Sequence, residues 1–96
     1  MESPREQSIE KFHSENLPVQ VRSVADAIWK LLYQEYGIDF EATEVTGSPV
    51  VEFRIGEDDE LSTETFAQIA ETVAAPGIQI SFNPDEQTIL VTPLLN

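Results

Sequence analysis

The sequence predicts an α+β domain in which two helices cover one face of a four-stranded, largely antiparallel sheet. Apolar residues recur at helical spacing over residues 16–36 and 62–75, and at every second position in the segments that follow each of these two. Turn residues divide each alternating segment into two strands, so the order is helix, strand, strand, helix, strand, strand. We expect a partly helical or flexible N-terminal arm over residues 1–15 and a single domain over residues 16–96.

The N-terminal arm has the pattern of a helix start. Ser3 stands at the cap position, Pro4 at the first helical position and Glu6 three residues after the cap. Only Ile9 and Phe12 give the arm an apolar side, and isolated helices of this length are marginal in water. The arm is therefore expected to form a helix only where it packs on the rest of the domain.

The first long helix is expected to run from Pro18 to Tyr36. Gly37 follows as the residue that takes the left-handed conformation at helix ends. Its core-facing side consists of Val21, Val24, Ala25, Ile28, Leu31 and Leu32. The second helix is expected to begin at Ser62 and to stop before residues 76–77, with a buried stripe of Phe66, Ile69, Ala70 and Val73.

Each helix is followed by an expected hairpin. The first joins strands over residues 38–43 and 50–55 through a turn rich in Gly, Ser and Pro. The second joins residues 78–82 and 87–92 through the turn at residues 83–86. In the first hairpin an apolar face alternates with a charged face, so the charged side chains are expected to point away from the helices.

Composition limits the chemistry and the compartment. The chain has no cysteine, which excludes disulfides and sulfur-ligated metal sites and fits a reducing compartment. The N-terminus has neither the basic nor the apolar region of a signal peptide, and no run of about 18 apolar residues occurs. We expect a cytoplasmic protein with no membrane contact, no cofactor and no metal.

Negative charge is concentrated in residues 35–64. This stretch holds ten acidic residues and one basic residue, Arg54, whereas residues 1–34 carry −1 and residues 65–96 carry −3 of the net charge of −13. Such a chain repels polyanions, so direct binding of nucleic acid is not expected. A concentrated field of this sign favours a basic protein partner.

The acidic partner-binding face is expected to comprise Asp39, Glu41, Glu52, Asp58 and Asp59. Residues 57–60 also resemble a cation-binding run, but they lack the alternating ligands and central glycine of a calcium loop. Acidic residues before a helix are favoured by the helix dipole, which explains the run structurally. The single histidine, His13, is interpreted as a solvated surface residue.

Two aromatic residues fall outside the apolar side of the first long helix. With Ile28 as its centre, Trp29 lies about 100° and Tyr33 about 140° around the helix. Two interpretations remain open. The arm covers them through Ile9 and Phe12, or Phe12, Trp29 and Tyr33 form a partner or homodimer contact.

These patterns favour a small acidic protein-interaction or regulatory module that binds a basic protein surface. One version is an inhibitor that mimics nucleic acid by presenting carboxylates where its partner binds phosphates. The alternative is a salt-adapted (halophilic) cytoplasmic protein of unrelated role, which the presence of only two lysines favours. A carboxylate-based enzyme using Glu41 and Glu52 is a third alternative. No catalytic motif occurs, and we do not expect an enzyme.

Overall fold

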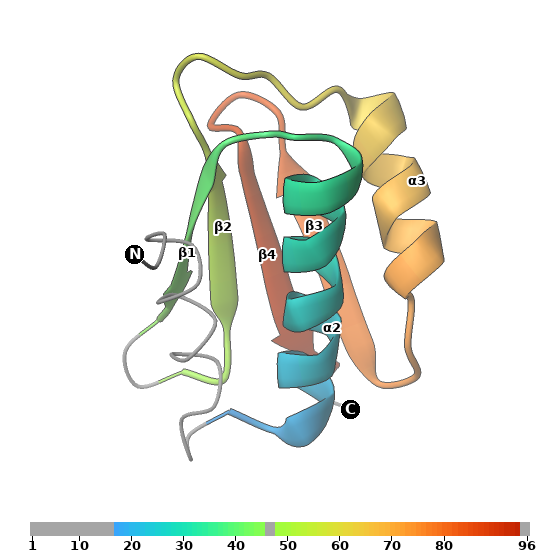
Figure 1. The fold of residues 1–96 in the computed structure, drawn as a ribbon. Helices are drawn as coiled ribbons and strands as arrows, with labels where there is room; N and C mark the ends of the chain where they lie inside the picture. Colours follow the sequence, from blue (N-terminus) through green and yellow to red (C-terminus); the bar gives the residue numbers. More distant parts are fainter. Residues whose placement is uncertain (1–16, 46–47, 95–96) are drawn as a thin grey trace, which may run out of the picture.

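The computed structural model describes residues 17–45 and 48–94 (Figure 1). The expected N-terminal arm, with Phe12 and His13, lies outside this part of the chain. The elements are α2 (Val19–Lys30), the π-helix η1 (Leu31–Glu35), β1 (Phe40–Glu44), β2 (Val51–Ile55), α3 (Thr63–Val73), β3 (Ile78–Asn83) and β4 (Thr88–Pro93). The observed strands begin and end within two residues of the expected ones.

The four strands form one sheet in the order β1-β2-β4-β3, and every neighbouring pair is antiparallel. Helices α2 and α3 lie on the same face of this sheet, as Figure 1 shows. The predicted α+β architecture is therefore confirmed. The sequence did not indicate the strand order, in which β1 and β3 are the edges and β4 pairs with both β2 and β3.

The core lies between the sheet and the helices and extends further toward β1 than the helical pattern suggested. Trp29 is only 2% exposed, and its ring packs edge-on against Phe40 with the ring centroids 4.8 Å apart. Phe40 in turn contacts Phe53 of β2, with centroids 5.8 Å apart. The structure thus places Trp29 in the core, because edge strand β1 widens the apolar surface that faces α2.

The last turn of the first long helix differs from the expectation. The α-helix ends at Lys30, and the next five residues form a π-helix, in which the Tyr36 N–H donates to the Leu31 carbonyl at 3.1 Å. Gly37 then adopts a positive φ of 61°, and the Ile38 N–H donates to the Leu32 carbonyl at 2.9 Å. The predicted helix end is confirmed at Gly37, while the prediction of a continuous α-helix to Tyr36 is wrong.

Helix α3 begins as its sequence predicts. The Ser62 side chain accepts the Thr65 N–H at 3.0 Å, which caps the helix. Ile69 and Val73 are buried in the core. Phe66 stacks on Phe82 of β3 with ring centroids 5.0 Å apart, which holds α3 beside that edge strand.

Candidate functional site

The acidic side of the sheet is built by the β1–β2 hairpin. Alternation places Phe40 and Ala42 in the core and Glu41 and Thr43 on the face that the helices leave uncovered. The register pairs Glu41 with Arg54 and Thr43 with Glu52. The predicted face residues Glu41 and Glu52 therefore share one side of the hairpin, diagonally across it.

The rest of this uncovered face is neutral. Continuing the two rows across the sheet, Glu52 is paired with Leu90 and Arg54 with Thr88 of β4. Leu90 is paired in turn with Ser81 of β3. The uncovered face thus changes from charged at the β1–β2 side to uncharged at the β3 side.

A hollow of about 250 Å³ lies on the charged part of the face, lined by Glu41, Thr43, Val45, Glu52 and Arg54. Arg54 lies beside Glu52, with Nη2 3.4 Å from Oε2. The Arg54 side chain is 66% exposed and that of Glu52 32% exposed, so water screens this ion pair and it contributes little to stability. Both side chains remain accessible to a partner.

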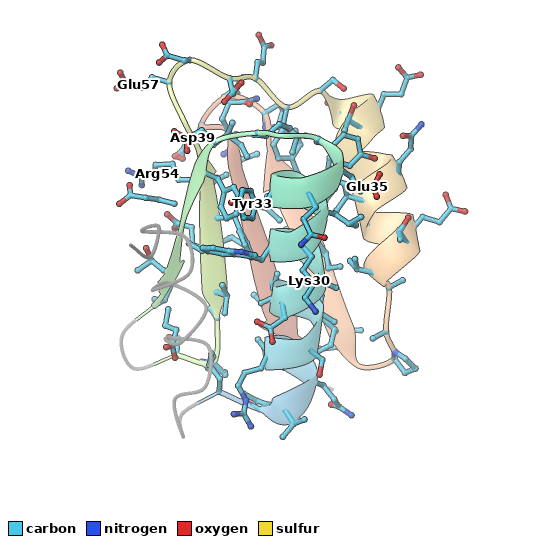
Figure 2. The ribbon with its side chains drawn as sticks, in the orientation of Figure 1. Lys30, Tyr33, Glu35, Asp39, Arg54 and Glu57 are labelled. Carbon is cyan, nitrogen blue, oxygen red and sulfur yellow. The ribbon has the colours of Figure 1, made fainter. Side chains whose placement is uncertain are left out.

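A second hollow of about 440 Å³ lies around the edge of the same hairpin, and it shares Glu41 and Arg54 with the first. Its lining adds Asp39, Phe40, Ile55, Gly56 and Glu57. Figure 2 shows Asp39, Arg54 and Glu57 gathered at this edge. Arg54 was expected on this face with the other charged side chains of the hairpin, whereas Glu57 was not predicted among the face residues.

Asp39 directly precedes β1, and its backbone extends the pairing of β1 with β2 by one residue. Its carbonyl accepts the Gly56 N–H at 2.8 Å, and its own N–H donates to Asp59 Oδ2 at 2.9 Å. A Cβ at position 56 would lie 3.1 Å from Asp39 Oδ2, so glycine allows this close approach. Strand β1 thus begins two residues later than expected, while the Asp39 side chain is exposed and lines the same hollow as Glu41 and Arg54.

Asp58 and Asp59 are adjacent but differ in their surroundings. The Asp59 carboxylate is engaged within the protein by the Asp39 N–H, and the Asp59 N–H donates to the Gly56 carbonyl at 3.0 Å. Asp58 is exposed in the same turn. Of the two, Asp58 is the residue whose charge is directed to solvent.

Gln87 fixes the loop that follows this turn. It adopts a positive φ of 55°. Its side chain accepts the Leu61 N–H at 2.6 Å and donates to the Leu61 carbonyl at 3.1 Å. Since the two residues are far apart in sequence, no local pattern predicted this contact, which connects the loop before α3 to the β3–β4 turn.

The aromatic candidates do not form one exposed group. Trp29 is in the core, and Phe12 lies outside the described residues. Tyr33, on η1, is 39% exposed. Its role in a partner or homodimer contact stays a prediction.

Two chemical alternatives can be compared with the geometry. In residues 17–45 and 48–94, no group of three or more histidine, cysteine or acidic side chains is arranged to hold a metal ion. Glu41 and Glu52 lie on one face, but Glu41 is exposed and Arg54 lies beside Glu52. Acid–base catalysis by a carboxyl pair requires that one of them be desolvated.

Comparison of the chain with protein-family models, curated proteins and solved structures found no match. Among the helices in the described ranges, none is long and apolar enough to cross a membrane.

Proposed function

We propose that this protein is a binding module whose β1–β2 edge engages a basic surface of a protein partner. The observation that carries the proposal is the unequal charge of the uncovered sheet face. Glu41 and Glu52 lie on the hairpin, Asp39, Glu57 and Asp58 lie at its end, and the β3 side of the face is uncharged. A concentration of acids at one edge orients an approaching cationic partner, whereas evenly distributed charge would not.

The shape of the edge is consistent with a macromolecular partner. Both hollows are only half enclosed, and they are lined mainly by polar side chains, whereas small-molecule pockets are usually enclosed and apolar. An inhibitor that presents carboxylates in place of nucleic acid phosphates is one form of this function. Arg54 restricts the choice of partner, since a basic group placed opposite it would be repelled.

The first experiment identifies the partner by affinity capture at low salt, followed by elution in a salt gradient. Association rates of the captured protein are then measured for a triple variant, Glu41→Lys, Glu52→Lys and Asp58→Lys. We expect association at low salt to slow by about tenfold or more, because charge reversal removes electrostatic steering.

The matched control reverses three exposed acids elsewhere: Glu71→Lys, Asp85→Lys and Glu86→Lys. It changes the net charge by the same amount and is expected to slow association much less. Equal effects of the two triple variants would show that net charge alone governs binding, and would contradict a binding edge at β1–β2.

A further inference from the structure

The two edges of the sheet differ in how they are protected against pairing with another strand. Edge strand β1 carries Glu41 and Glu44 among its five residues, and charge on an edge strand opposes the addition of further strands. Edge strand β3, Ile78–Asn83, contains no charged residue, no proline and no glycine. It also pairs with β4 over all six residues. Edge β3 is therefore the unprotected one.

The backbone groups available at this edge follow from the ladder. The Leu94 N–H donates to the Gly77 carbonyl at 2.8 Å, so in the alternating pattern of an antiparallel pair Gln79, Ser81 and Asn83 bond to β4. The N–H and C=O groups of Ile80 and Phe82 then point outward. Further along, the Ile78 N–H is already used by the Ala75 carbonyl at 3.3 Å.

Apolar side chains border the same edge. Ile80 and Phe82 of β3 and Phe66 and Ala70 of α3 are all half-buried. Phe66 and Phe82 stack on each other, and α3 lies beside β3 on the helix-covered side of the sheet (Figure 1). A strand added to β3 would bury more of these four side chains, which stabilises it beyond its backbone hydrogen bonds.

Charge indicates the chemistry of the added strand. No basic residue occurs from Ile55 to Leu94, and exposed acids on α3, Glu64 and Glu71, and in the turn that follows β3 give this half of the molecule a negative charge. A second copy of this chain would bring these acids together and place its own α3 against the first α3. A basic extended segment without a helix of its own would avoid both the repulsion between acids and the contact between two α3 helices.

We propose that β3 accepts an extended segment of a partner protein as a fifth, antiparallel strand, paired through the backbone of Ile80 and Phe82. The segment has apolar residues on the side that faces α3 and basic residues on the other side. This surface lies at the opposite edge of the sheet from the β1–β2 binding edge. Either proposal can therefore fail without the other.

The test uses a synthetic peptide of alternating valine and lysine as the probe and follows backbone amides by NMR and hydrogen exchange. We expect saturable binding with slower exchange of the Ile80 and Phe82 amides, because both become hydrogen-bonded. A peptide of the same sequence, N-methylated at alternate residues, keeps its charge but cannot form the ladder, and it is expected to give no protection.

Two variants locate the site. Ser81→Lys places a like charge on the pairing strand and is expected to weaken peptide binding by roughly two- to fivefold. Ser23→Lys is the matched control, an exposed serine on helix α2 that lies on neither edge strand, and is expected to change the affinity less.

Three outcomes of the peptide experiments would overturn the proposal. They are no protection of Ile80 and Phe82 at millimolar peptide, equal binding of the N-methylated peptide, and equal weakening by Ser23→Lys. Protection that rises with protein concentration in the absence of peptide would identify a second copy as the occupant and would also overturn it.

Discussion

Asp58 and Asp59 illustrate that adjacent acidic residues can serve different purposes. Both were predicted to face a partner, since they carry the same charge and are neighbours in the same acidic run. The Asp59 carboxylate accepts a hydrogen bond from the Asp39 N–H. This bond connects the turn after β2 to the start of β1. Asp58, in the same turn, is exposed to solvent. Only the fold, which brings residues 39 and 59 together, separates them.

Asp59→Ala is therefore expected to lower the free energy of unfolding by about 1 kcal/mol, because the Asp39 N–H loses its acceptor. Asp58→Ala removes the same charge from the same turn and is expected to change the free energy of unfolding by less than about 0.5 kcal/mol. Urea unfolding of both variants measures the difference. Equal midpoints would show that the hydrogen bond to Asp39 contributes nothing to stability.

The helix dipole explains fewer of the acidic residues before α3 than the sequence suggested. Acids near a helix start are stabilised by the helix dipole, but the effect falls off within the first turn. Glu64 is the acidic residue in the first turn of α3, whereas residues 57–60 precede the capping residue Ser62. The dipole therefore accounts for Glu64, and the exposed acids Glu57 and Asp58 remain available for a partner.

At the scale of helices and strands, the sequence predicted those features that depend on residues close together in the chain. The cap at Ser62, the helix end at Gly37 and the alternation of both hairpins are confirmed, since each depends on residues close in sequence. The π-helix at residues 31–35 was not predicted. A single π-helical turn of five residues is too short for its apolar spacing to differ visibly from that of an α-helix. The strand order and the contact between Gln87 and Leu61 join residues that are far apart in the chain. No pattern within a single sequence indicates which distant residues meet.

The end of the first helix gives a test of local backbone preference. Gly37 has φ of 61°, and an added Cβ there would meet no atom within 4 Å. Gly37→Ala is thus expected to lower the free energy of unfolding by about 1 kcal/mol through backbone strain alone. Gly37→Asn should cost less, because asparagine tolerates the left-handed region.

Chemical denaturation of the two Gly37 variants measures this order. If both substitutions had the same cost, a property other than the backbone conformation, such as the exposed side chain, would be responsible. Circular dichroism of the folded variants provides the control that the helix content is unchanged.

For the whole molecule, the balance of charge is the property that most affects behaviour in solution. The net charge is −13 over 96 residues, and the acids at the β1–β2 edge lie close enough to repel one another. Such repulsion destabilises the compact state. The side of the sheet that Glu41 and Glu52 occupy was predicted correctly because strand alternation decides it, whereas the position of β3 at the edge opposite β1 emerged only with the strand order.

The dependence of thermal stability on salt concentration distinguishes an acidic binding edge from a general adaptation of the protein to high salt. The Debye length falls from about 10 Å at 0.1 M to about 3 Å at 1 M, so repulsion among the acids at the β1–β2 edge is almost fully screened by 1 M. We expect the thermal midpoint in potassium chloride to rise by several degrees up to about 1 M, equivalent to roughly 1 kcal/mol for a domain of this size, and then to level off. Thermal unfolding followed by circular dichroism measures the curve. A strong rise that continues to about 3 M would instead favour the salt-adapted alternative, because screening of neighbouring charges is already complete at lower salt.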